Sequence, residues 1–292
     1  MEKVSVIIPV YNGEKYIKES INSVLNQTYK NIEIVIIDDC STDRTKDVIF
    51  KNFKNLIGKK IIYHRNERNR ERVYSRNKGV NISTGKYIYF LDYDDIYTKE
   101  YIEKSIQYLK GNDIVYSIPR TFIDFNGNIL RISKKRVKSL KELIFGGNIG
   151  YPSASAFKRE SFIKYRQEYL FREDWEIFIR AYLKGLKIKL LDKNLVYMRE
   201  HQNRTSRNIK FLKATLKVYN DYLNKIPKEY KAIFRFHTGE IALRYGDLLN
   251  GWVMIILAFI SNPSLLKDDR LLLSVLKRGF RIDRAIKYYF FG

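Results

Sequence analysis

The chain has 292 residues, of which 45% are hydrophobic and 14% aromatic, so it can bury an enzyme-sized core and is not an intrinsically disordered protein. Its single cysteine, Cys40, excludes an intrachain disulfide framework and zinc sites built from several thiolates. The formal net charge of +23 predicts a positive field that attracts phosphates, anionic lipids or nucleic acid, without choosing between them.

The N-terminal residues 1–14 have the pattern of a strand that runs into a turn. They lack the basic and long apolar segments of a signal peptide. The longest uninterrupted apolar run, Trp252–Ile260, is shorter than the ~20 residues that a membrane-spanning helix needs. We therefore expect a cytoplasmic protein without an integral membrane segment.

The first hundred residues alternate strand-like apolar runs with helical patterns, which is typical of a parallel α/β sheet. The predicted strands are Val4–Ile8, Ile32–Ile37, Lys60–Tyr63 and Tyr87–Leu91. The predicted helices are one with Ile17, Ile21, Val24 and Leu25 on a single face, and two crossover helices over Thr42–Phe53 and Arg72–Ser83. Ligands of such sheets bind at the carboxyl ends of the strands, so polar residues there are site candidates.

Further along the chain we expect a strand over Asp113–Ile118 and a hairpin within Arg120–Ser133, turning at Asn126-Gly127. A loop over 146–152 and a helix over 171–184 follow. Two short apolar runs, Ile188–Leu191 and Leu195–Met198, precede the polar stretch Arg199–Asn208. The pattern becomes helical from residue 209. We therefore predict a first domain over 1–208, with halves 1–105 and 106–208, and a helical region over 209–292.

Four polar clusters fall where the predicted layout places the ends of strands. They are Pro9-Val10-Tyr11-Asn12 with Glu14, Asp38-Asp39-Cys40-Ser41-Thr42-Asp43, Arg76-Asn77-Lys78-Gly79, and Asp92-Tyr93-Asp94-Asp95. One alternative for Asp38 and Asp39 is that they cap the following helix and supply acids to its first turn.

The acids Asp92, Asp94 and Asp95 directly follow a buried strand, where their charges repel one another unless a cation or water relieves them. Mg²⁺ commonly binds one or two protein carboxylates and takes its other ligands from water and phosphate. A site for a divalent metal and a diphosphate therefore explains the cluster. The alternative is an acidic turn that caps the helix beginning near Thr98.

Two segments, VSVIIPVYNGEKYIKESINSVLNQTYKNIEIVIIDDCSTDRT and RNKGVNISTGKYIYFLDYDD, resemble the nucleotide-binding half of family 2 glycosyltransferases over residues 3–105. The resemblance implies a GT-A fold: a Rossmann-like, mixed and mainly parallel sheet with helices on both faces, here with a C-terminal helical extension. It implies that the Pro9–Tyr11 turn and Asp39 contact the nucleobase, that Asp92 lies near the ribose, and that Asp94 holds Mn²⁺ or Mg²⁺ on the donor diphosphate. The full set of donor candidates is Pro9, Val10, Tyr11, Glu14, Asp38, Asp39, Arg76, Asp92 and Tyr93.

The second half resembles the family more loosely. By this resemblance Asp174 takes the proton from the acceptor hydroxyl and Glu173 helps to position the acceptor or the base; an exposed acidic first turn of a helix is the alternative. The acceptor-side candidates are Gly150 and Ser153 of the loop Gly147–Ser155, and Trp175 of the acidic motif. In Arg199-Glu200-His201, His201 resembles a histidine that ligates the metal or touches the diphosphate, and a solvated side chain is the alternative.

The chain departs from the family pattern at two positions. Tyr93 replaces the usual small residue of the D-x-D motif, and Cys40 replaces the commoner glycine. The Q-x-x-R-W motif is absent, which disfavours a processive polysaccharide synthase.

The sequence thus predicts an inverting, metal-dependent, non-processive glycosyltransferase. The donor would be a nucleotide-diphosphate sugar, with UDP by analogy, and the acceptor a lipid-linked or cell-surface glycan precursor. A nucleotidyltransferase that makes nucleotide sugars is one alternative, although the first turn lacks the glycine- and basic-rich phosphate loop that it needs. A basic nucleic-acid-binding protein is another, but it leaves the acids unexplained, so we expect no nucleic-acid partner.

The last residues have the pattern of a basic amphipathic helix. Its apolar face consists of Ile282, Ile286, Tyr289 and Phe290, and its basic face of Lys277, Arg281, Arg284 and Lys287. Such a helix could rest on an anionic membrane that carries the acceptor, or pack on the protein with its cations solvated. Peripheral attachment to the cytoplasmic membrane face therefore stays open.

Overall fold

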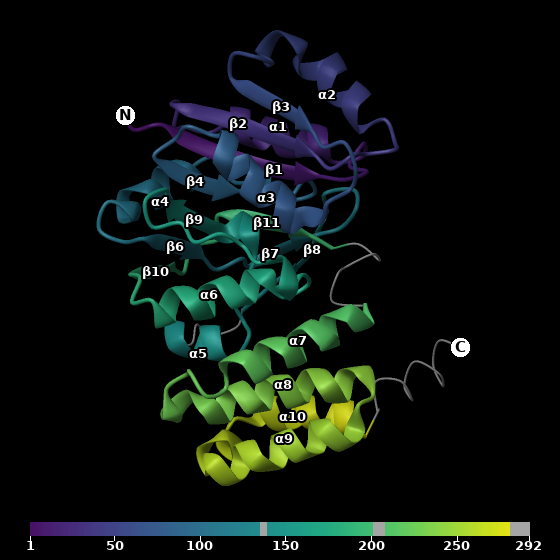
Figure 1. Ribbon diagram of the computed structural model, residues 1–292, viewed down its shortest axis with the longest axis vertical. Coiled ribbons are helices and arrows are strands. Elements are labelled where there is room, and N and C mark those ends of the chain that lie inside the picture. Colours follow the sequence, from purple (N-terminus) through teal and green to yellow (C-terminus); the bar gives the residue numbers. More distant parts are fainter. Residues whose placement is uncertain (135–138, 201–207, 281–292) are drawn as a thin grey trace. The chain divides into compact units, whose positions relative to one another are not determined.

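The computed structural model describes residues 1–134, 139–200 and 208–280 (Figure 1). The chain forms two compact units. The first is Met1–Val137, Gly150–Glu168 and Arg180–Asn203; the second is Lys138–Ile149, Tyr169–Ile179 and Arg204–Gly292. Segments of the two units alternate along the chain. The predicted domain boundary after residue 208 stays a prediction.

A seven-stranded sheet forms the centre of the first unit. Its strand order is β10-β6-β9-β4-β1-β2-β3 (Figure 1). The strands are β1 Val4–Val10, β2 Ile32–Asp38, β3 Ile61–Arg65, β4 Tyr87–Phe90, β6 Ile114–Ser117, β9 Ser155–Lys158 and β10 Ile188–Leu191. Only β9 runs antiparallel to its neighbours in this sheet. The predicted mixed, mainly parallel sheet is therefore confirmed, as are the four strands expected in the first hundred residues.

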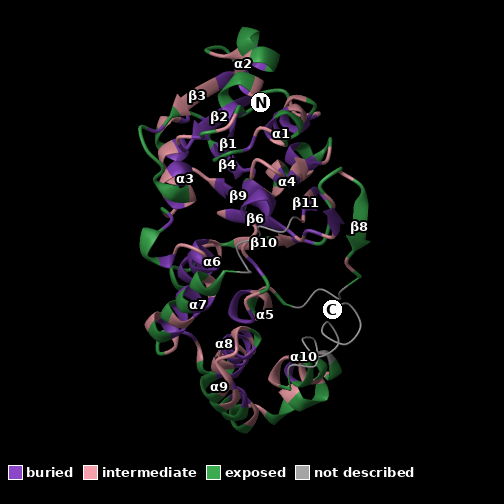
Figure 2. Ribbon diagram, turned by 90° about the vertical axis from the view of Figure 1, so that its right-hand side faces the viewer, coloured by how far each residue is buried: buried purple, intermediate pink, exposed green. Residues whose placement is uncertain are grey.

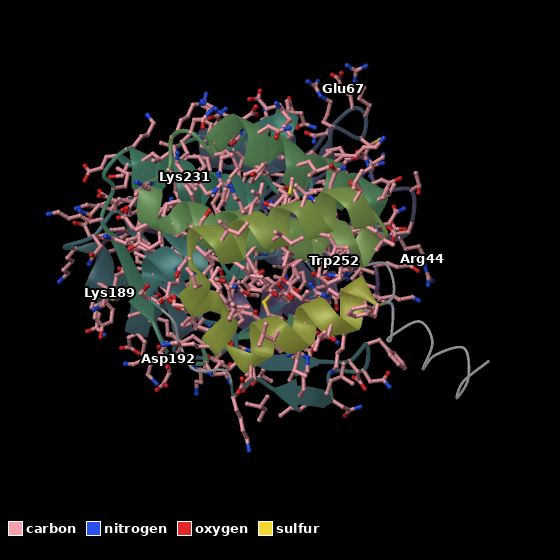
Figure 3. All side chains as sticks on the ribbon, turned by 90° about the horizontal axis from the view of Figure 1, so that it is seen from below. Arg44, Glu67, Lys189, Asp192, Lys231 and Trp252 are labelled. Carbon is pink, nitrogen blue, oxygen red and sulfur yellow. The ribbon has the colours of Figure 1, made fainter. Side chains whose placement is uncertain are left out.

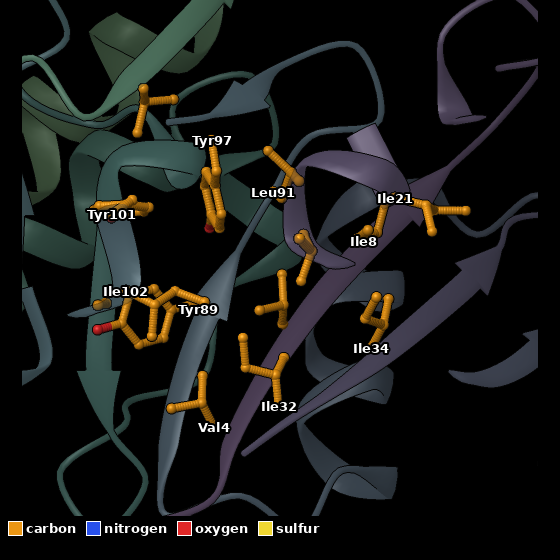
Figure 4. Close-up of a cluster of buried hydrophobic side chains, with 14 of the residues drawn as sticks. Val4, Ile8, Ile21, Ile32, Ile34, Tyr89, Leu91, Tyr97, Tyr101 and Ile102 are labelled. Atoms are coloured by element: carbon orange, nitrogen blue, oxygen red, sulfur yellow. The ribbon is translucent and has the colours of Figure 1, made fainter. Parts of the chain in front are cut away.

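Helices cover both faces of this sheet. They are α1 Ile17–Leu25, α2 Thr45–Phe53, α3 Glu71–Ile82 and α4 Tyr101–Leu109. All seven residues of β1 are buried, which requires cover on both sides. Ile8 of β1 clusters with Ile21 of α1, Ile34 of β2 and Tyr101 of α4 (Figure 4), whereas α3 packs against β1 and β2. The sheet is thus a rigid support for the loops at its edges.

A second, four-stranded sheet has the order β5-β11-β7-β8. Its strands are β5 Ile96–Tyr97, β7 Thr121–Ile123, β8 Ile129–Ile132 and β11 Val196–Arg199. The strands β7 and β8 form the predicted hairpin, with Gly127 at a φ of 90° in the turn. All four residues of β8 are exposed at the sheet edge (Figure 2).

The second unit is helical, as the pattern after residue 209 predicts. Its helices are α5 Leu140–Phe145, α7 Ile209–Tyr222, α8 Lys231–Tyr245, α9 Leu248–Ser261, α10 Asp269–Gly279 and the first part of α6 Glu173–Leu183. The rings of Trp175 and Tyr219 both lie beside that of Phe234 in its interior. Within the described ranges, no helix has both the length and the apolar character of a membrane span. Most of the predicted basic amphipathic helix, residues 281–292, lies outside these ranges.

Candidate functional site

The carboxyl ends of β1, β2 and β3 lie next to one another, with Val10 opposite Asp38 and Asp38 opposite Arg65. The strand β4 pairs with β1 on the other side, so the loop after β4 begins at the same edge. The structure therefore brings together three of the predicted clusters, those that follow β1, β2 and β4. The fourth, Arg76-Asn77-Lys78-Gly79, lies within α3 Glu71–Ile82 and not at a strand end.

Asp38 is fully buried and accepts three hydrogen bonds. The donors are Ser41 N at 2.8 Å, Tyr63 Oη at 2.6 Å and Arg65 Nη1 at 3.0 Å. Burial and the bond to Asp38 raise the pKa of Tyr63. The helix α2 begins at Thr45 with Arg44 as its N-cap. The helix-capping alternative is therefore wrong, because Asp38 instead fastens the loop after β2 to β3.

Asp39 connects the same loop to the segment after β3. Its backbone N–H donates to Val10 O at 2.8 Å. Both Asn66 Nδ2, at 2.7 Å, and the Arg70 N–H, at 2.9 Å, donate to its Oδ1 atom. Among the described residues, the hydrogen-bond donors to the Asp39 carboxylate thus reach Oδ1 rather than Oδ2. The guanidinium of Arg70 lies 4.1 Å from the centre of the Tyr74 ring.

The turn after β1 is held by the loop after β2. Asn12 accepts from the Thr42 N–H at 2.8 Å, and Glu14 accepts from the Arg44 N–H at 3.0 Å. The Tyr11 side chain is 41% exposed and makes no hydrogen bond within the described residues. Glu14 therefore fixes the turn, whereas Tyr11 presents an aromatic face to solvent.

Cys40 adopts a left-handed backbone conformation, with a φ of 65°. Glycine adopts this conformation without the steric cost that a Cβ atom brings. This explains why the sequence pattern that the chain resembles usually has glycine at this position.

Arg76 and Asp92 form a partly buried ion pair. Arg76 Nη2 donates to Asp92 Oδ1 at 2.9 Å, and the arginine is buried while the aspartate is 30% exposed. The Asp92 N–H donates to Ser153 Oγ at 3.0 Å. The predicted residues Arg76, Asp92 and Ser153 thus lie together, and the neighbouring Gly150 has a φ of 115°.

Asp95 is the buried member of the acidic loop. It accepts from Ser153 Oγ at 2.5 Å and from the Arg199 N–H at 2.9 Å. Burial, followed by the charges of Asp94 and Asp92, raises the pKa of Asp95 well above its usual value. The helix α4 has Glu100 as its N-cap, so the alternative in which the acidic loop caps this helix is wrong.

Tyr93 packs against the turn after β1. A Cβ atom on Gly13 would lie 2.7 Å from Tyr93 Cδ2 and 2.5 Å from Val10 Cγ2, so glycine is required there. Ser20 Oγ donates to the carbonyl oxygens of Tyr93 and Asp95, at 2.7 and 2.8 Å. The larger residue at position 93 therefore joins the acidic loop to the turn that carries Tyr11.

Arg199 is a buried residue that the sequence interpretation did not place in the site. Its Nε donates to Asp94 O at 2.9 Å, its Nη1 to Asp124 O at 2.7 Å and its Nη2 to Glu19 Oε2 at 2.5 Å. The signal was available, because Arg199 directly follows the predicted apolar run Leu195–Met198, as Asp92 follows Tyr87–Leu91. His201, the predicted metal ligand nearby, lies outside the described residues.

The described part of the chain has no group of three or more His, Cys, Asp or Glu side chains placed to hold a metal ion. Asp95 is occupied by Ser153 and Arg199, and Asp92 by Arg76. The half-buried Asp94 adds negative charge to a loop whose acids already repel one another. This arrangement fits a cation that takes one carboxylate from the protein and its remaining ligands from a diphosphate and water.

The acidic motif of the second unit begins the helix α6. Glu173 is only 1% exposed and Asp174 is half-buried, so the alternative of an exposed acidic turn is wrong for Glu173. Trp175, a predicted acceptor-side residue, is also 1% exposed, and its Nε1 donates to Ile144 O at 2.6 Å. Trp175 therefore packs in the interior of this unit. Glu176 accepts a hydrogen bond from Tyr222 Oη in the same interior.

A buried arginine–histidine pair lies beside this motif. Arg172 Nη2 donates to His237 Nε2 at 2.7 Å, because a guanidinium can only donate. Burial, then the charges of Arg172 and Arg278, lower the pKa of His237 well below its usual value. Gly147 has a φ of 64°, and a Cβ atom there would lie 2.0 Å from His237 Nε2. The histidine thus joins Arg172 to the Gly147 loop.

The chain is similar in sequence to several proteins of one family. The model described as "Glycosyl transferase family 2" matches residues 5–166. An uncharacterized glycosyltransferase of Methanocaldococcus jannaschii is 35% identical over 205 residues, which cover 67% of this chain and 70% of that relative. The UDP-Glc:alpha-D-GlcNAc-diphosphoundecaprenol beta-1,3-glucosyltransferase WfaP of Escherichia coli is 31% identical over 214 residues, with 71% and 81% covered.

Solved structures share the fold at low sequence identity. The structure of S. aureus TarS 1-349 in complex with UDP-GlcNAc has a TM-score of 0.65 and 21% identity, over 88% of this chain and 79% of that one. The mannosyltransferase PcManGT from Pyrobaculum calidifontis, in complex with GDP-Man and Mn²⁺, has a TM-score of 0.65 and 16% identity, over 99% and 84%.

Proposed function

Because the chain belongs to glycosyl transferase family 2, we propose that it is an inverting, metal-dependent and non-processive member that uses a UDP-sugar. It has the GT-A fold, as the sequence predicts, and it is a glycosyltransferase that acts on nucleotide sugars. Family membership decides against the nucleotidyltransferase and the nucleic-acid-binding alternatives.

One observation carries the donor half of this proposal: Tyr11, Asp39 and the acidic loop meet at the carboxyl edge of a single sheet. Tyr11 has an exposed ring that can stack on a nucleobase, and Asp39 Oδ2 can accept an N–H of that base. The Arg76–Asp92 pair keeps part of the Asp92 carboxylate exposed for a ribose hydroxyl. These groups support recognition of a nucleoside.

We assign the diphosphate end of the donor to Asp94, which would hold Mn²⁺ or Mg²⁺, with His201 as a further predicted ligand. A bound metal would neutralise the charge that develops on the leaving diphosphate. Arg199 keeps the Asp94 backbone in place, and Ser153 does the same for Asp95. Of the similar proteins, TarS is in complex with UDP-GlcNAc, PcManGT is in complex with GDP-Man, and WfaP is named for UDP-Glc, which favours UDP as the nucleotide.

In the acceptor half, Asp174 would act as the general base. The acceptor oxygen attacks the anomeric carbon, the bond from that carbon to the diphosphate oxygen breaks, and the hydroxyl proton passes to Asp174. One in-line displacement of this kind inverts the anomeric carbon. The buried Glu173 and the Arg172–His237 pair would keep the first turn of α6 in a fixed conformation.

The acceptor would be a lipid-linked or cell-surface glycan precursor. The support is the name of WfaP, whose acceptor is a diphosphoundecaprenol-linked sugar. Such an acceptor would place the enzyme at the cytoplasmic face of a membrane. The absence of a Q-x-x-R-W motif supports transfer of single sugars over processive synthesis.

A donor screen tests the proposal. UDP- and GDP-sugars are added with Mn²⁺ or Mg²⁺, and thermal stabilisation and donor hydrolysis are measured. We expect a response to at least one UDP-sugar that disappears with a chelator. A protein that responds to no donor, with or without metal, would contradict the proposed activity.

The base is tested by Asp174→Asn. Loss of a general base lowers turnover by about 10²- to 10⁴-fold, and we expect donor affinity by calorimetry to change by less than about twofold. The matched control is Asp221→Asn, another acid of the second unit, which binds Tyr169 and Lys217. A product with retained anomeric configuration would refute Asp174 as the sole base.

A further inference from the structure

The outer face of α9 is apolar. Its exposed residues Leu249, Val253, Ile256, Leu257 and Ile260, here called the α9 stripe, are 44% to 77% exposed. At about 100° per residue they fall on one side of the helix. The opposite side, with Gly251, Ile255 and Ala258, is buried. The whole helix, Leu248–Ser261, contains no charged residue.

This is the reverse of an ordinary surface helix, whose solvent face is polar. The helix α4 of the same protein exposes Glu103 and Gln107, whereas α9 exposes leucine, valine and isoleucine. Contiguous exposed apolar patches usually contact another protein or a membrane. The α9 stripe therefore needs a partner that covers it.

The helix α10 lies beside α9 and extends the apolar surface. Figure 3 shows Trp252 between the two helices, and its ring lies 5.8 Å from that of Phe280. Leu273, Leu276 and Phe280 are exposed by 45% to 65%. Cations border this surface: Lys267 and Lys277 are exposed, and Arg235 Nη1 donates to Ser261 Oγ at the end of α9, at 3.2 Å.

The net charge of the chain favours an anionic bilayer over a second copy of the chain as the partner of the α9 stripe. Two copies of a chain with a net charge of +23 repel each other, whereas an anionic bilayer attracts each of them. The 14 residues of α9 span about 21 Å, which is shorter than the roughly 30 Å of a bilayer core. A helix with these properties lies in the membrane interface, with its apolar side chains among the acyl chains.

We propose that the α9 stripe docks onto an anionic lipid bilayer and holds the protein at its surface. The interaction needs neither donor nor acceptor, so it can be tested separately from the proposed catalytic activity. The apolar residues of the α9 stripe are also different from those of the predicted amphipathic helix, Ile282, Ile286, Tyr289 and Phe290, although Lys277 of its basic face borders the surface proposed here.

Vesicle co-sedimentation of the full chain tests this docking. Vesicles of phosphatidylcholine alone are compared with vesicles that also contain phosphatidylglycerol. We expect binding to the anionic vesicles, and a loss of at least about tenfold in affinity for the triple variant Leu249→Gln, Ile256→Gln and Ile260→Gln. The matched control changes three apolar residues of β8, Ile129→Gln, Leu130→Gln and Ile132→Gln, which are 53% to 60% exposed. It should bind as the unaltered chain does.

A second measurement uses the unaltered chain and so does not depend on the folding of a variant. The chain has two tryptophans, of which Trp175 is buried, so lipids with brominated acyl chains should quench Trp252 selectively. Bound protein without quenching would overturn the proposal, as would equal binding by the triple variant. A dimer that the triple variant loses, without vesicle binding by the native chain, would assign the stripe to a second copy instead.

Discussion

Buried carboxylates lie at both ends of the parallel strands of the seven-stranded sheet, at the amino ends (here the amino edge) and at the carboxyl ends (the carboxyl edge). Their hydrogen-bond partners differ between the two ends. At the amino edge, Glu33 near the start of β2 accepts from Ser5 Oγ at 2.6 Å, Thr84 N at 2.5 Å and Thr84 Oγ1 at 2.9 Å, and pairs with Lys3 at 2.5 Å. At the carboxyl edge, the acids lie in the loops after β2 and β4, and only some of them accept several hydrogen bonds, as Glu33 does.

The pKa values of Glu33 and Asp95 are shifted in opposite directions. Burial alone would raise the pKa of Glu33, but hydrogen bonds from Lys3, Ser5 and Thr84 outweigh it and lower the pKa to about 2. At Asp95, burial acts together with the charges of Asp94 and Asp92 to raise the pKa. A buried carboxylate that accepts several hydrogen bonds, such as Glu33, is stabilised in its charged form by the protein itself. A buried carboxylate beside other carboxylates, such as Asp95, lies where a cation would be stabilising.

The largest expected effect comes from removing charge at the carboxyl edge. Asp94→Asn should lower turnover by about 10²- to 10³-fold, because the proposed metal loses its protein carboxylate. Calorimetry with and without Mn²⁺ should show that the variant loses the metal-dependent part of donor binding. Glu103→Gln, at an exposed acid on α4, is the control. If Asp94→Asn keeps metal-dependent binding while Asp174→Asn loses it, the two roles must be exchanged.

At the amino edge the expected effect is on stability. The pKa of Glu33 is lowered from 4.5 to about 2, so its contribution is complete above pH 4.5 and is lost as the pH falls towards 2. Glu33→Gln should remove at most about 3 kcal/mol of unfolding free energy at neutral pH.

Urea unfolding over pH 2 to 7 measures this effect of Glu33, since the variant should lose less stability than the native chain on acidification. Donor affinity of the folded variant at neutral pH should stay unchanged, because the residue lies at the edge opposite the site. A parallel loss of stability in both proteins would show that Glu33 is not the group that titrates.

The strands and the site edge could be predicted because their signals are local. Apolar runs of strand length gave β1, β2 and β4, and the acids at their ends marked the edge. The roles of individual acids could not be predicted in this way, because their donors are distant in sequence. Asp38 binds Tyr63 and Arg65, and Asp95 binds Ser153 and Arg199.

Trp175 illustrates a conflict between two sequence signals. The motif resemblance assigns it to the acceptor side. The helix predicted over 171–184, in contrast, rests on the helical spacing of its apolar residues Phe171, Trp175, Phe178, Ile179 and Tyr182. The structure has Trp175 buried against Ile144, as the spacing indicates. The helical spacing of apolar residues predicts which side chains are buried. A resemblance to a short motif does not say whether each residue of that motif faces the site or the interior.

Arg199 is expected to have a smaller effect on the carboxyl ends of the strands, where it donates to Asp95 Oδ1 through its N–H and to Asp94 O through its Nε. Lysine keeps the charge but cannot reach Asp94 O, Asp124 O and Glu19 together. Arg199→Lys should therefore raise the Mn²⁺ concentration for half-maximal activity by roughly tenfold, with a smaller change in turnover. Arg120→Lys, at an arginine that pairs with Asp192, is the matched control. Lower thermal stability with unchanged metal activation would reduce Arg199 to a purely structural residue.

The smallest expected effect is on the unfolding free energy, and it depends on the backbone conformation of Cys40 at the carboxyl edge rather than on the charges there. A left-handed conformation costs a residue with a Cβ atom about 1–2 kcal/mol, while glycine loses about 0.5–1 kcal/mol more conformational entropy on folding. Cys40→Gly should therefore raise the unfolding free energy by about 0.5–1 kcal/mol in urea, because Cys40 has a φ of 65°. Cys40→Ala retains the Cβ atom and should give no such gain. If alanine stabilises as much as glycine, the cost comes from the thiol, which lies 3.6 Å from Glu67 O, and not from the backbone.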